Sequence, residues 1–223
     1  MHGERYFDAA QNTLLVANAE RYYRAMYYGS AASWNLRDQH MFDTLRSLLT
    51  FYGPNAKGVV WEHNSHVGDA SATEMSTRGE HNVGQLCRSA FGPRAYIVGF
   101  GTDHGSVAAA SNWDEPVQRM RVRPAQAGSY EALCHEAGVP AFLLHLRKPA
   151  RSALRDELEA ERLERAIGVI YRPESELASH YFYANLPRQF DEYIWFDETQ
   201  AVQPLPAPAQ SELELPDTYP FGL

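Results

Sequence analysis

The chain has little positive charge, few cysteines and no long apolar run. Its 20 Lys and Arg residues face 28 Asp and Glu, which gives a formal net charge of −8 at pH 7. This balance disfavours a nucleic-acid partner, because proteins that bind phosphate backbones carry a basic face. No segment approaches the roughly 20 apolar residues of a membrane span, and no charged-then-apolar leader opens the chain. We therefore expect a cytoplasmic protein with no nucleic-acid or membrane partner.

Several familiar catalytic signatures are also missing. Cys87 and Cys134 are the two cysteines and lie far apart in the sequence, which indicates buried reduced thiols and not a disulfide framework. The sequence contains no G-x-S-x-G elbow, no P-loop and no C-x-x-C. Residues 99–105, GFGTDHG, have glycines at the wrong spacing for a dinucleotide-binding loop. The function must therefore be sought in other residues.

The segments that are present predict an α/β fold. Apolar residues recur at spacings of three and four in two segments, which predicts helices over 6–28 and from Asn35 onward, with Leu36, Met41, Leu45, Leu48 and Leu49 as the buried stripe of the second. Further helices are expected at 83–90, 129–138 and 152–165. Short apolar segments predict strands at 59–61, 94–100, 141–147, 167–171 and 192–197.

Alternating strands and helices indicate a mainly parallel sheet with flanking helices. With 223 residues, 44% of them hydrophobic, we expect one domain over 1–223. It would consist of an N-terminal helical pair (6–52), an α/β part (57–202) and an extended, proline-rich tail (203–223). The polar stretch 68–82 has little periodicity and predicts a long loop.

The decapeptide WEHNSHVGDA, residues 61–70, is the main candidate for chemistry. His63 and His66 follow the predicted strand VVW, and in open α/β sheets ligands bind beyond the carboxyl ends of strands. Imidazoles suit proton transfer near neutral pH, since their ordinary pKa is about 6.5. They are also zinc ligands, with Glu62, Asp69, Glu74 and His104 as possible third ligands. A purely structural, capping role is the third interpretation.

Other candidates lie before and after this motif. Asp103 and His104 occupy the predicted loop after the next strand, where they either face the same crevice or form a tight turn. Arg37 can hold a carboxylate or stabilise an oxyanion, although a lone arginine is more often solvated. Asp38, near the expected start of the second helix, most simply complements the helix dipole. His145 is expected to pack in the core.

Five segments together resemble the erythromycin esterase family: ASWNLRDQHM (32–41), VVWEHNSHVGDASATEM (59–75), RGEHNVGQLCR (78–88), YIVGFGTDHGSVAAASNWD (96–114) and the stretch from Arg165 to Leu205. The resemblance implies an α/β protein with additional helices that hydrolyses a carboxylic ester, in characterised members the lactone of macrolide antibiotics, without a metal or other cofactor. In this picture His63, His66 and Arg37 are catalytic. Glu62, Asn64, Asp103 and His104 are assigned to substrate binding.

One departure narrows this expectation. The family's principal base histidine belongs to an N-terminal Gly-Glu-x-x-His-Gly motif, which is absent, so the chain resembles an incomplete, C-terminal half of a member. We therefore expect an esterase-like hydrolase that takes a small-molecule ester and lacks that base, with a complementary N-terminal half or self-association as further partners. Two alternatives stay open: a non-catalytic ligand-binding fragment, and a metal-dependent hydrolase built on the two histidines.

Overall fold

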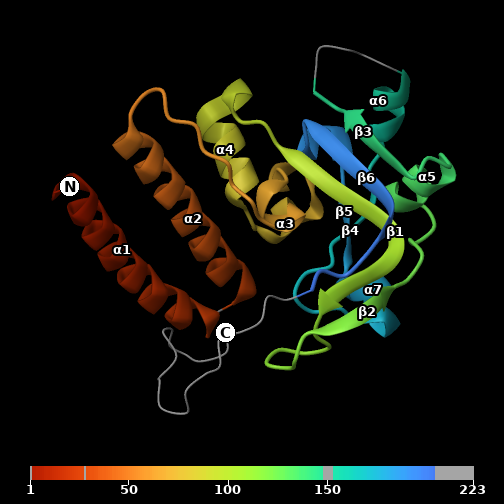
Figure 1. Ribbon diagram of the computed structural model, residues 1–223, viewed down its shortest axis with the longest axis horizontal. Helices are drawn as coiled ribbons and strands as arrows, with labels where there is room; N and C mark the ends of the chain where they lie inside the picture. The colour runs from red at the N-terminus through yellow and green to blue at the C-terminus, as the bar shows by residue number, and fades with distance from the viewer. Residues whose placement is uncertain (1, 28, 148–152, 204–223) are drawn as a thin grey trace. The chain divides into compact units, whose positions relative to one another are not determined.

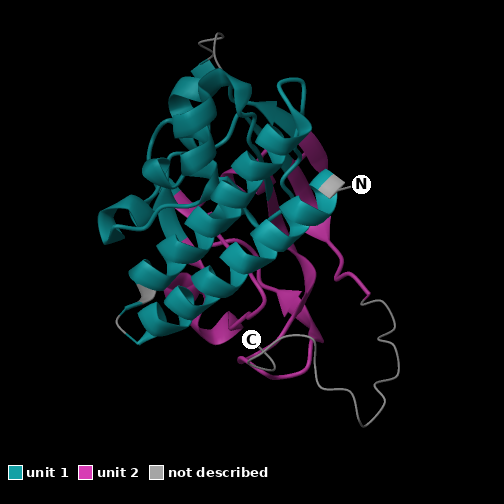
Figure 2. Cartoon of the chain, turned by 90° about the vertical axis from the view of Figure 1, so that its left-hand side faces the viewer, with its two compact units in different colours: residues 1–100, 143–162, 182–194 teal, residues 101–142, 163–181, 195–223 magenta. Residues whose placement is uncertain are grey.

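The computed structural model describes residues 2–27, 29–147 and 153–203. Apart from Gln203, the predicted tail over 203–223 lies outside the described residues. The chain forms two compact units, coloured separately in Figure 2: unit 1 comprises Met1–Phe100, Leu143–Arg162 and Phe182–Ile194, and unit 2 comprises Gly101–Phe142, Leu163–Tyr181 and Trp195–Leu223. None of the helices in the described ranges combines the length and the apolarity needed to cross a bilayer.

Two long helices open unit 1. The helices α1 (His2–Met26) and α2 (Ser30–Tyr52) pack side by side, and α4 (Val83–Phe91) packs against α2 (Figure 1). Both predicted helices are present, but α2 begins at Ser30, one turn and more before Asn35. Its fully buried positions are Asp38 and Phe42, and the predicted leucine stripe is only partly buried. The face of α2 that carries Phe42 packs on Phe91 of α4.

A four-stranded sheet has the order β2–β1–β6–β3, formed by β2 (Gln118–Val122), β1 (Val98–Ala109), β6 (Glu192–Thr199) and β3 (Ala141–His145). The pair β1–β2 is antiparallel. So is β6–β3, since Asp197 bonds to Pro140 while Asp191 bonds to Leu146. Only β1 and β6 run parallel. The α/β class is confirmed and the mainly parallel sheet is wrong.

Connection length explains this correction. Residues 110–117 are all that join β1 to β2, whereas a parallel crossover needs a dozen or more residues.

A second sheet pairs β4 (Arg162–Arg165) with β5 (Tyr181–Ala184). The shorter helical elements are α3 (Asn64–Val67), η1 (Ala70–Ala72), η2 (Glu74–Arg78), η3 (Gly92–Arg94), α5 (Tyr130–Glu136), α6 (Ala153–Leu158), η4 (Pro173–Ser175), α7 (Glu176–Ser179) and α8 (Leu186–Gln189).

The predicted buried strand at 59–61 does not form. Residues 57–63, all described, lie in no helix or strand, and Val59 and Trp61 are 91% and 84% exposed. A strand needs backbone partners as well as β-branched residues. The backbone N–H and C=O of Phe100 in β1 are instead occupied by the side-chain amide of Asn64, at 3.1 and 2.7 Å. The histidine motif thus follows an extended segment, not a sheet strand.

Further expectations need correction. The strand predicted at 167–171 does not form, and Ile170 makes an isolated bridge to Ala110. The segment 101–106, expected to be a loop, lies within β1. The segment 152–165, expected to be one helix, divides into the short α6 and the strand β4. His145, expected in the core, has a side chain that is 73% exposed and lies 2.7 Å from Glu192. In contrast, the helix predicted at 129–138 is present as α5, capped by the Ser129 side chain as its sequence suggests.

Each unit has its own buried interior. In unit 1 the carboxylate of Asp191 is buried, accepts two bonds from the Arg88 guanidinium at 2.9 and 3.1 Å, and accepts the Ile97 N–H at 2.8 Å. In unit 2 the fully buried side chains include Val122, Tyr130, Tyr171 and Trp195. A buried carboxylate with this many donors ties together segments that are far apart in sequence.

Candidate functional site

A buried aspartate orients one histidine of the decapeptide. Asp38 is completely buried in α2, and both of its carboxylate oxygens lie near Nδ1 of His66, at 2.9 and 3.1 Å. One of them also accepts the backbone N–H of Val83, the first residue of α4, at 3.2 Å. Asp38 does not serve the helix dipole, because α2 starts well before it. Its position instead makes it the partner of His66.

Arg37 and Trp34 complete the surroundings of His66. A guanidinium nitrogen, Nη2 of Arg37, lies 3.2 Å from Nε2 of His66. The imidazole stacks on the Trp34 indole with ring centres 4.6 Å apart and an interplanar angle of 6°, and the Arg37 guanidinium lies over the same indole at 4.7 Å. Trp34, Arg37 and Asp38 share one face of α2 because they are three and four residues apart. Since arginine only donates, His66 accepts at Nε2 and donates from Nδ1 to Asp38.

Asn82 holds the turn that carries His66. It caps α4 by accepting the N–H of Gln85 at 3.0 Å, and the same oxygen accepts the N–H of Ala70 at 3.3 Å. Its amide nitrogen donates to the carbonyls of Ser65 and Gly68 at 2.8 and 2.6 Å. All four hydrogen-bonding positions of this buried side chain are therefore used. The result is a rigid link between α4 and the segment around α3.

The other histidine of the motif has a different environment. His63 is the N-cap of α3, and its Nδ1 accepts the N–H of Ser65 at 3.2 Å and lies 2.9 Å from the Ser65 hydroxyl. The capping role anticipated for one or both histidines is therefore real for His63. Asn64 uses both ends of its amide on Phe100, so it positions this segment against β1. The catalytic and substrate-binding roles assigned to these two residues stay predictions.

Glu62 supplies a second carboxyl group near Asp38 and His66. Burial raises its pKa and the nearby Asp38 adds to this effect, while His66 and Arg37 partly oppose it. Its Oε2 is buried without a hydrogen-bond partner among the described residues. Burial also raises the pKa of the nearby Cys87 thiol to about 11, with Glu62 contributing. Cys87 is thus a protonated thiol near neutral pH and unsuited to nucleophilic chemistry.

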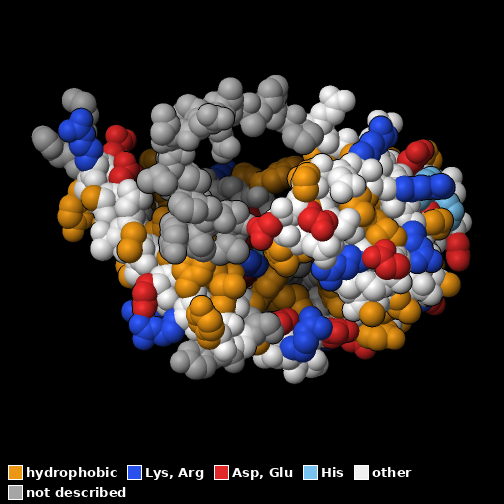
Figure 3. Space-filling view, turned by 90° about the horizontal axis from the view of Figure 1, so that it is seen from below, with side chains coloured by type: hydrophobic (Ala, Val, Ile, Leu, Met, Phe, Trp, Pro, Cys, Tyr) orange, Lys and Arg blue, Asp and Glu red, His pale blue; other side chains and the backbone are white. Residues whose placement is uncertain are grey.

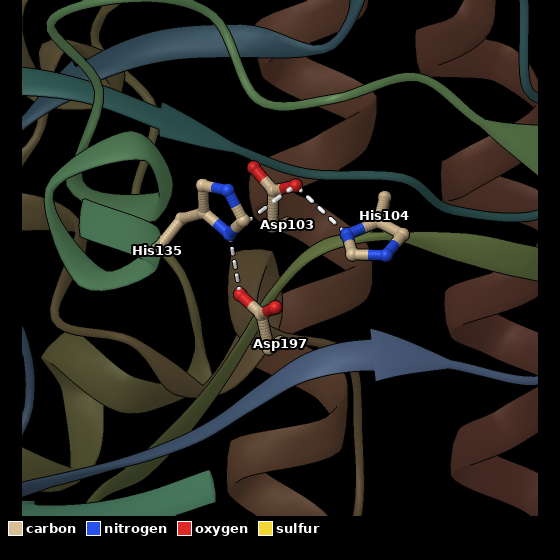
Figure 4. Close-up of side chains that lie close together, drawn as sticks. All are labelled: Asp103, His104, His135 and Asp197. Atoms are coloured by element: carbon tan, nitrogen blue, oxygen red, sulfur yellow. Dashed lines mark hydrogen bonds and ion pairs between the residues drawn. The ribbon is translucent and has the colours of Figure 1, made fainter. Parts of the chain in front are cut away.

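Asp103 and His104 belong to unit 2, in a cluster that sequence reasoning did not assemble (Figure 4). His104 Nδ1 lies 2.9 Å from Asp103 Oδ2, and His135 from α5 and Asp197 from β6 complete the group. The hydrogen bond to Asp197 raises the pKa of His135, and Asp103 adds to it. No spacing in the sequence connects these four residues, because they come from three separate elements.

The structure also bears on the metal interpretation of the decapeptide. Within the described ranges, the group of histidine and carboxylate side chains close enough to hold an ion is the one in unit 2, and it contains neither His63 nor His66. Of the residues sequence reasoning missed, Asp38 is the most important. Its role comes from contacts with His66 and Val83, which lie 28 and 45 residues further along the chain, so no local pattern indicates it.

The chain is similar in sequence or structure to several known proteins. The family model described as erythromycin esterase matches residues 1–199. A Bacillus cereus protein of solved structure superposes with a TM-score of 0.63 at 20% identity, over 77% of this chain and 40% of its own. A succinoglycan biosynthesis protein gives 0.62 at 18% identity, over 89% of this chain and 48% of its own.

A third solved structure is a histidine-to-asparagine mutant of the erythromycin esterase EreC in its open conformation. It superposes with a TM-score of 0.53 at 14% identity, over 78% of this chain and 40% of its own. At these identities the structural matches establish the fold alone, and the chain spans less than half the length of each solved chain. The match of the family model over residues 1–199 shows that the chain belongs to the erythromycin esterase family.

Proposed function

We propose that the chain supplies catalytic residues for the hydrolysis of a carboxylic ester, with a macrocyclic lactone as one possible form of that ester. The single observation that carries the proposal is the connected series Asp38–His66–Arg37, in which a buried carboxylate orients an imidazole and a guanidinium faces its other nitrogen. Family membership supports the same reaction class.

The geometry suggests a division of roles. Asp38 fixes the ring so that Nε2 points toward Arg37, where a reacting oxygen would enter between them. Nε2 of His66 would then exchange a proton with that oxygen, and Arg37 would donate to the carbonyl oxygen as it becomes an oxyanion. In the structure these two groups contact each other, so substrate must replace their mutual hydrogen bond. Apo sites commonly tighten only when substrate binds.

Glu62 fits the third requirement of ester cleavage, a proton donor near the leaving alkoxide. Its raised pKa favours the protonated carboxyl over a wider pH range than an exposed glutamate would show. In the protonated form it donates one hydrogen bond, which also suits it to hold a substrate hydroxyl. We therefore propose that Glu62 contacts the substrate.

Purified protein supplied with a family N-terminal half that carries the Gly-Glu-x-x-His-Gly motif should hydrolyse an activated aryl ester or a macrocyclic lactone, followed by absorbance or by chromatography of the ring-opened acid. We expect His66→Ala to lower kcat/KM by about 10²–10⁴-fold and Arg37→Ala by about 10²–10³-fold. His145→Ala removes an exposed histidine of unit 1 and serves as the matched control. No turnover of any ester, or full activity in His66→Ala, contradicts the proposal.

Location and partners complete the proposal. We propose a cytoplasmic protein whose small-molecule partner is the ester substrate. Hydrophobic side chains reach the surface at many points of the face in Figure 3. The exposed hydrophobic residues of unit 1 include Leu14, Leu15, Val59 and Trp61. Such exposure supports the expected association with a complementary half or a second copy of the chain. Light scattering across a concentration series tests the association with a second copy of the chain.

A further inference from the structure

The cluster in unit 2 brings four potential metal ligands to one point. Asp103 and His104 come from β1, His135 from α5 and Asp197 from β6, and Figure 4 shows their side chains turned toward one another. The nearest ligand atoms of all four lie within 4.8 Å of one another. The individual separations include 2.9 Å for Asp103–His104, 3.7 Å for Asp103–His135 and 2.7 Å for His135–Asp197.

These separations match the size of a tetrahedral site. Ligand atoms about 2.0–2.1 Å from a zinc ion at tetrahedral angles lie about 3.3 Å apart. The three short separations lie on either side of this value, so the side chains need only small rotations to surround one ion. Two imidazoles and two carboxylates favour a first-row transition ion, because Mg²⁺ and Ca²⁺ prefer oxygen ligands alone.

The surroundings hold the ligands in this arrangement. Asp103 is buried, and its Oδ1 accepts the Ala125 N–H at 3.0 Å, which leaves Oδ2 facing both imidazoles. The buried Arg165 donates to the main-chain carbonyls of Thr102 and Asp103. Such second contacts fix the orientation of metal ligands in known sites. The Arg165 guanidinium is itself paired with Glu176 at 3.2 Å, so it does not compete for the Asp103 carboxylate.

The strand departs from regular geometry at this point. Successive residues of a strand normally point to opposite faces, yet the side chains of Asp103 and His104 contact each other. The next residue, Gly105, has φ +117°, a conformation that other residues rarely adopt. The irregularity brings both side chains to the same point of β1, where regular strand geometry would direct them to opposite faces.

We propose that Asp103, His104, His135 and Asp197 bind one divalent transition-metal ion, with Zn²⁺ as the expected occupant. Four protein ligands leave no open position, so the ion is structural: it joins β1, α5 and β6 of unit 2. Two carboxylates directed at one point repel each other, and a dication removes that repulsion. The partial exposure of His135 and Asp197 gives the ion a path of entry.

The test is titration of chelator-treated protein, with any polyhistidine tag removed, by Zn²⁺ alone in a calorimeter. We expect one Zn²⁺ per chain in the wild type and at least about 10-fold weaker binding in His135→Ala and in Asp197→Asn. Zn²⁺ should also raise the Tm of the wild type and not that of either variant. X-ray absorption should show only N and O ligands near 2.0–2.1 Å.

The controls separate this site from general histidine binding. Both substituted side chains are partly exposed, and circular dichroism confirms that the variants are folded before titration. His145→Ala should bind Zn²⁺ like the wild type, because its imidazole belongs to unit 1. Absence of stoichiometric binding overturns the proposal. So does binding that is equally strong in the wild type, His135→Ala and Asp197→Asn.

Discussion

Asp38→Asn is the sharpest test of the His66 site, because the change removes one charge and one acceptor without changing the volume. Two carboxylate oxygens of Asp38 face three donors: Nδ1 of His66, the N–H of Val83 and, at 3.8 Å, Nε of Arg37. Asparagine offers one oxygen and one NH₂ group. With its oxygen at the Oδ2 position, asparagine still accepts from Val83 and from Nδ1 of His66, and its NH₂ faces Nε of Arg37 and Nδ1; with the amide turned over, the NH₂ faces both the N–H of Val83 and Nδ1.

The loss of stability in Asp38→Asn follows from the number of donors left without an acceptor. Either amide orientation leaves at least one donor facing a donor in a completely buried position. An unsatisfied buried donor costs about 1–3 kcal/mol. For a chain of this length, 1 kcal/mol corresponds to a fall in Tm of about 2–4 °C. The same loss should lower ester hydrolysis by about 10²-fold or more, because the ring is no longer held with Nε2 as the acceptor.

The assay compares Asp38→Asn with Asp43→Asn, a residue of the same helix whose carboxylate is about half exposed and 3.8 Å from Arg46. The control should change the free energy of unfolding by less than about 0.5 kcal/mol, as exposed pairs do. Thermal unfolding gives the stability, and ¹⁵N NMR of the imidazole gives the tautomer of His66. Equal Tm and equal activity for the two variants would refute the reasoning.

Three further predictions concern unit 1. Folding raises the pKa of Glu62, so the stability that its protonated form contributes is complete at low pH and is lost as pH rises through the raised pKa. The free energy of unfolding of Glu62→Gln, measured in urea titrations, should therefore increase relative to that of the wild type from pH 4 to pH 8. Asp191→Ala removes both hydrogen bonds from the Arg88 guanidinium, which keeps only the more distant Asp69 at 3.9 Å, and it leaves the Ile97 N–H without its acceptor; it should cost about 3 kcal/mol in the same assay, whereas a cost below 1 kcal/mol contradicts the contact. At Gly84 an added Cβ would lie 1.9 Å from the carbonyl oxygen of Val67, so Gly84→Ala should lower the stability by about 1–3 kcal/mol, and an unchanged Tm contradicts that packing.

Local signals predicted the helices well and the strands poorly. The cap at Ser129 and the stop at Gly138 define α5 through contacts within a few residues. The triplet at 59–61 has the same kind of local signal, yet whether it joins a sheet depends on β1, about 40 residues away. The direction of a strand likewise depends on its connections, and the short link between β1 and β2 was hidden because β1 was expected to end at 100.

The candidate site, like the fold, could be predicted from the sequence only where local signals were sufficient. Sequence reasoning proposed His63, His66 and Arg37 from their residue types and a family resemblance, and the structure places His66 and Arg37 in contact. It misjudged Asp38, whose role depends on a contact with α3 and α4 that no local spacing reveals. It proposed Asp103 and His104 together but could not add His135 and Asp197, because ligands from separate elements converge only after folding. The sequence therefore indicates which residue types can take part in a site, whereas the contacts among them depend on the folded structure.

The two histidine clusters contain the same residue types, and our proposals for them differ because the nearest cation differs. In unit 1 the guanidinium of Arg37 faces His66 directly, so the positive charge that an oxyanion requires is part of the chain. A metal ion would be repelled there. In unit 2 the nearby Arg165 is directed at main-chain carbonyls, and the side chains that face the carboxylates of Asp103 and Asp197 in the cluster are imidazoles. The missing positive charge at that point is what a bound dication would provide.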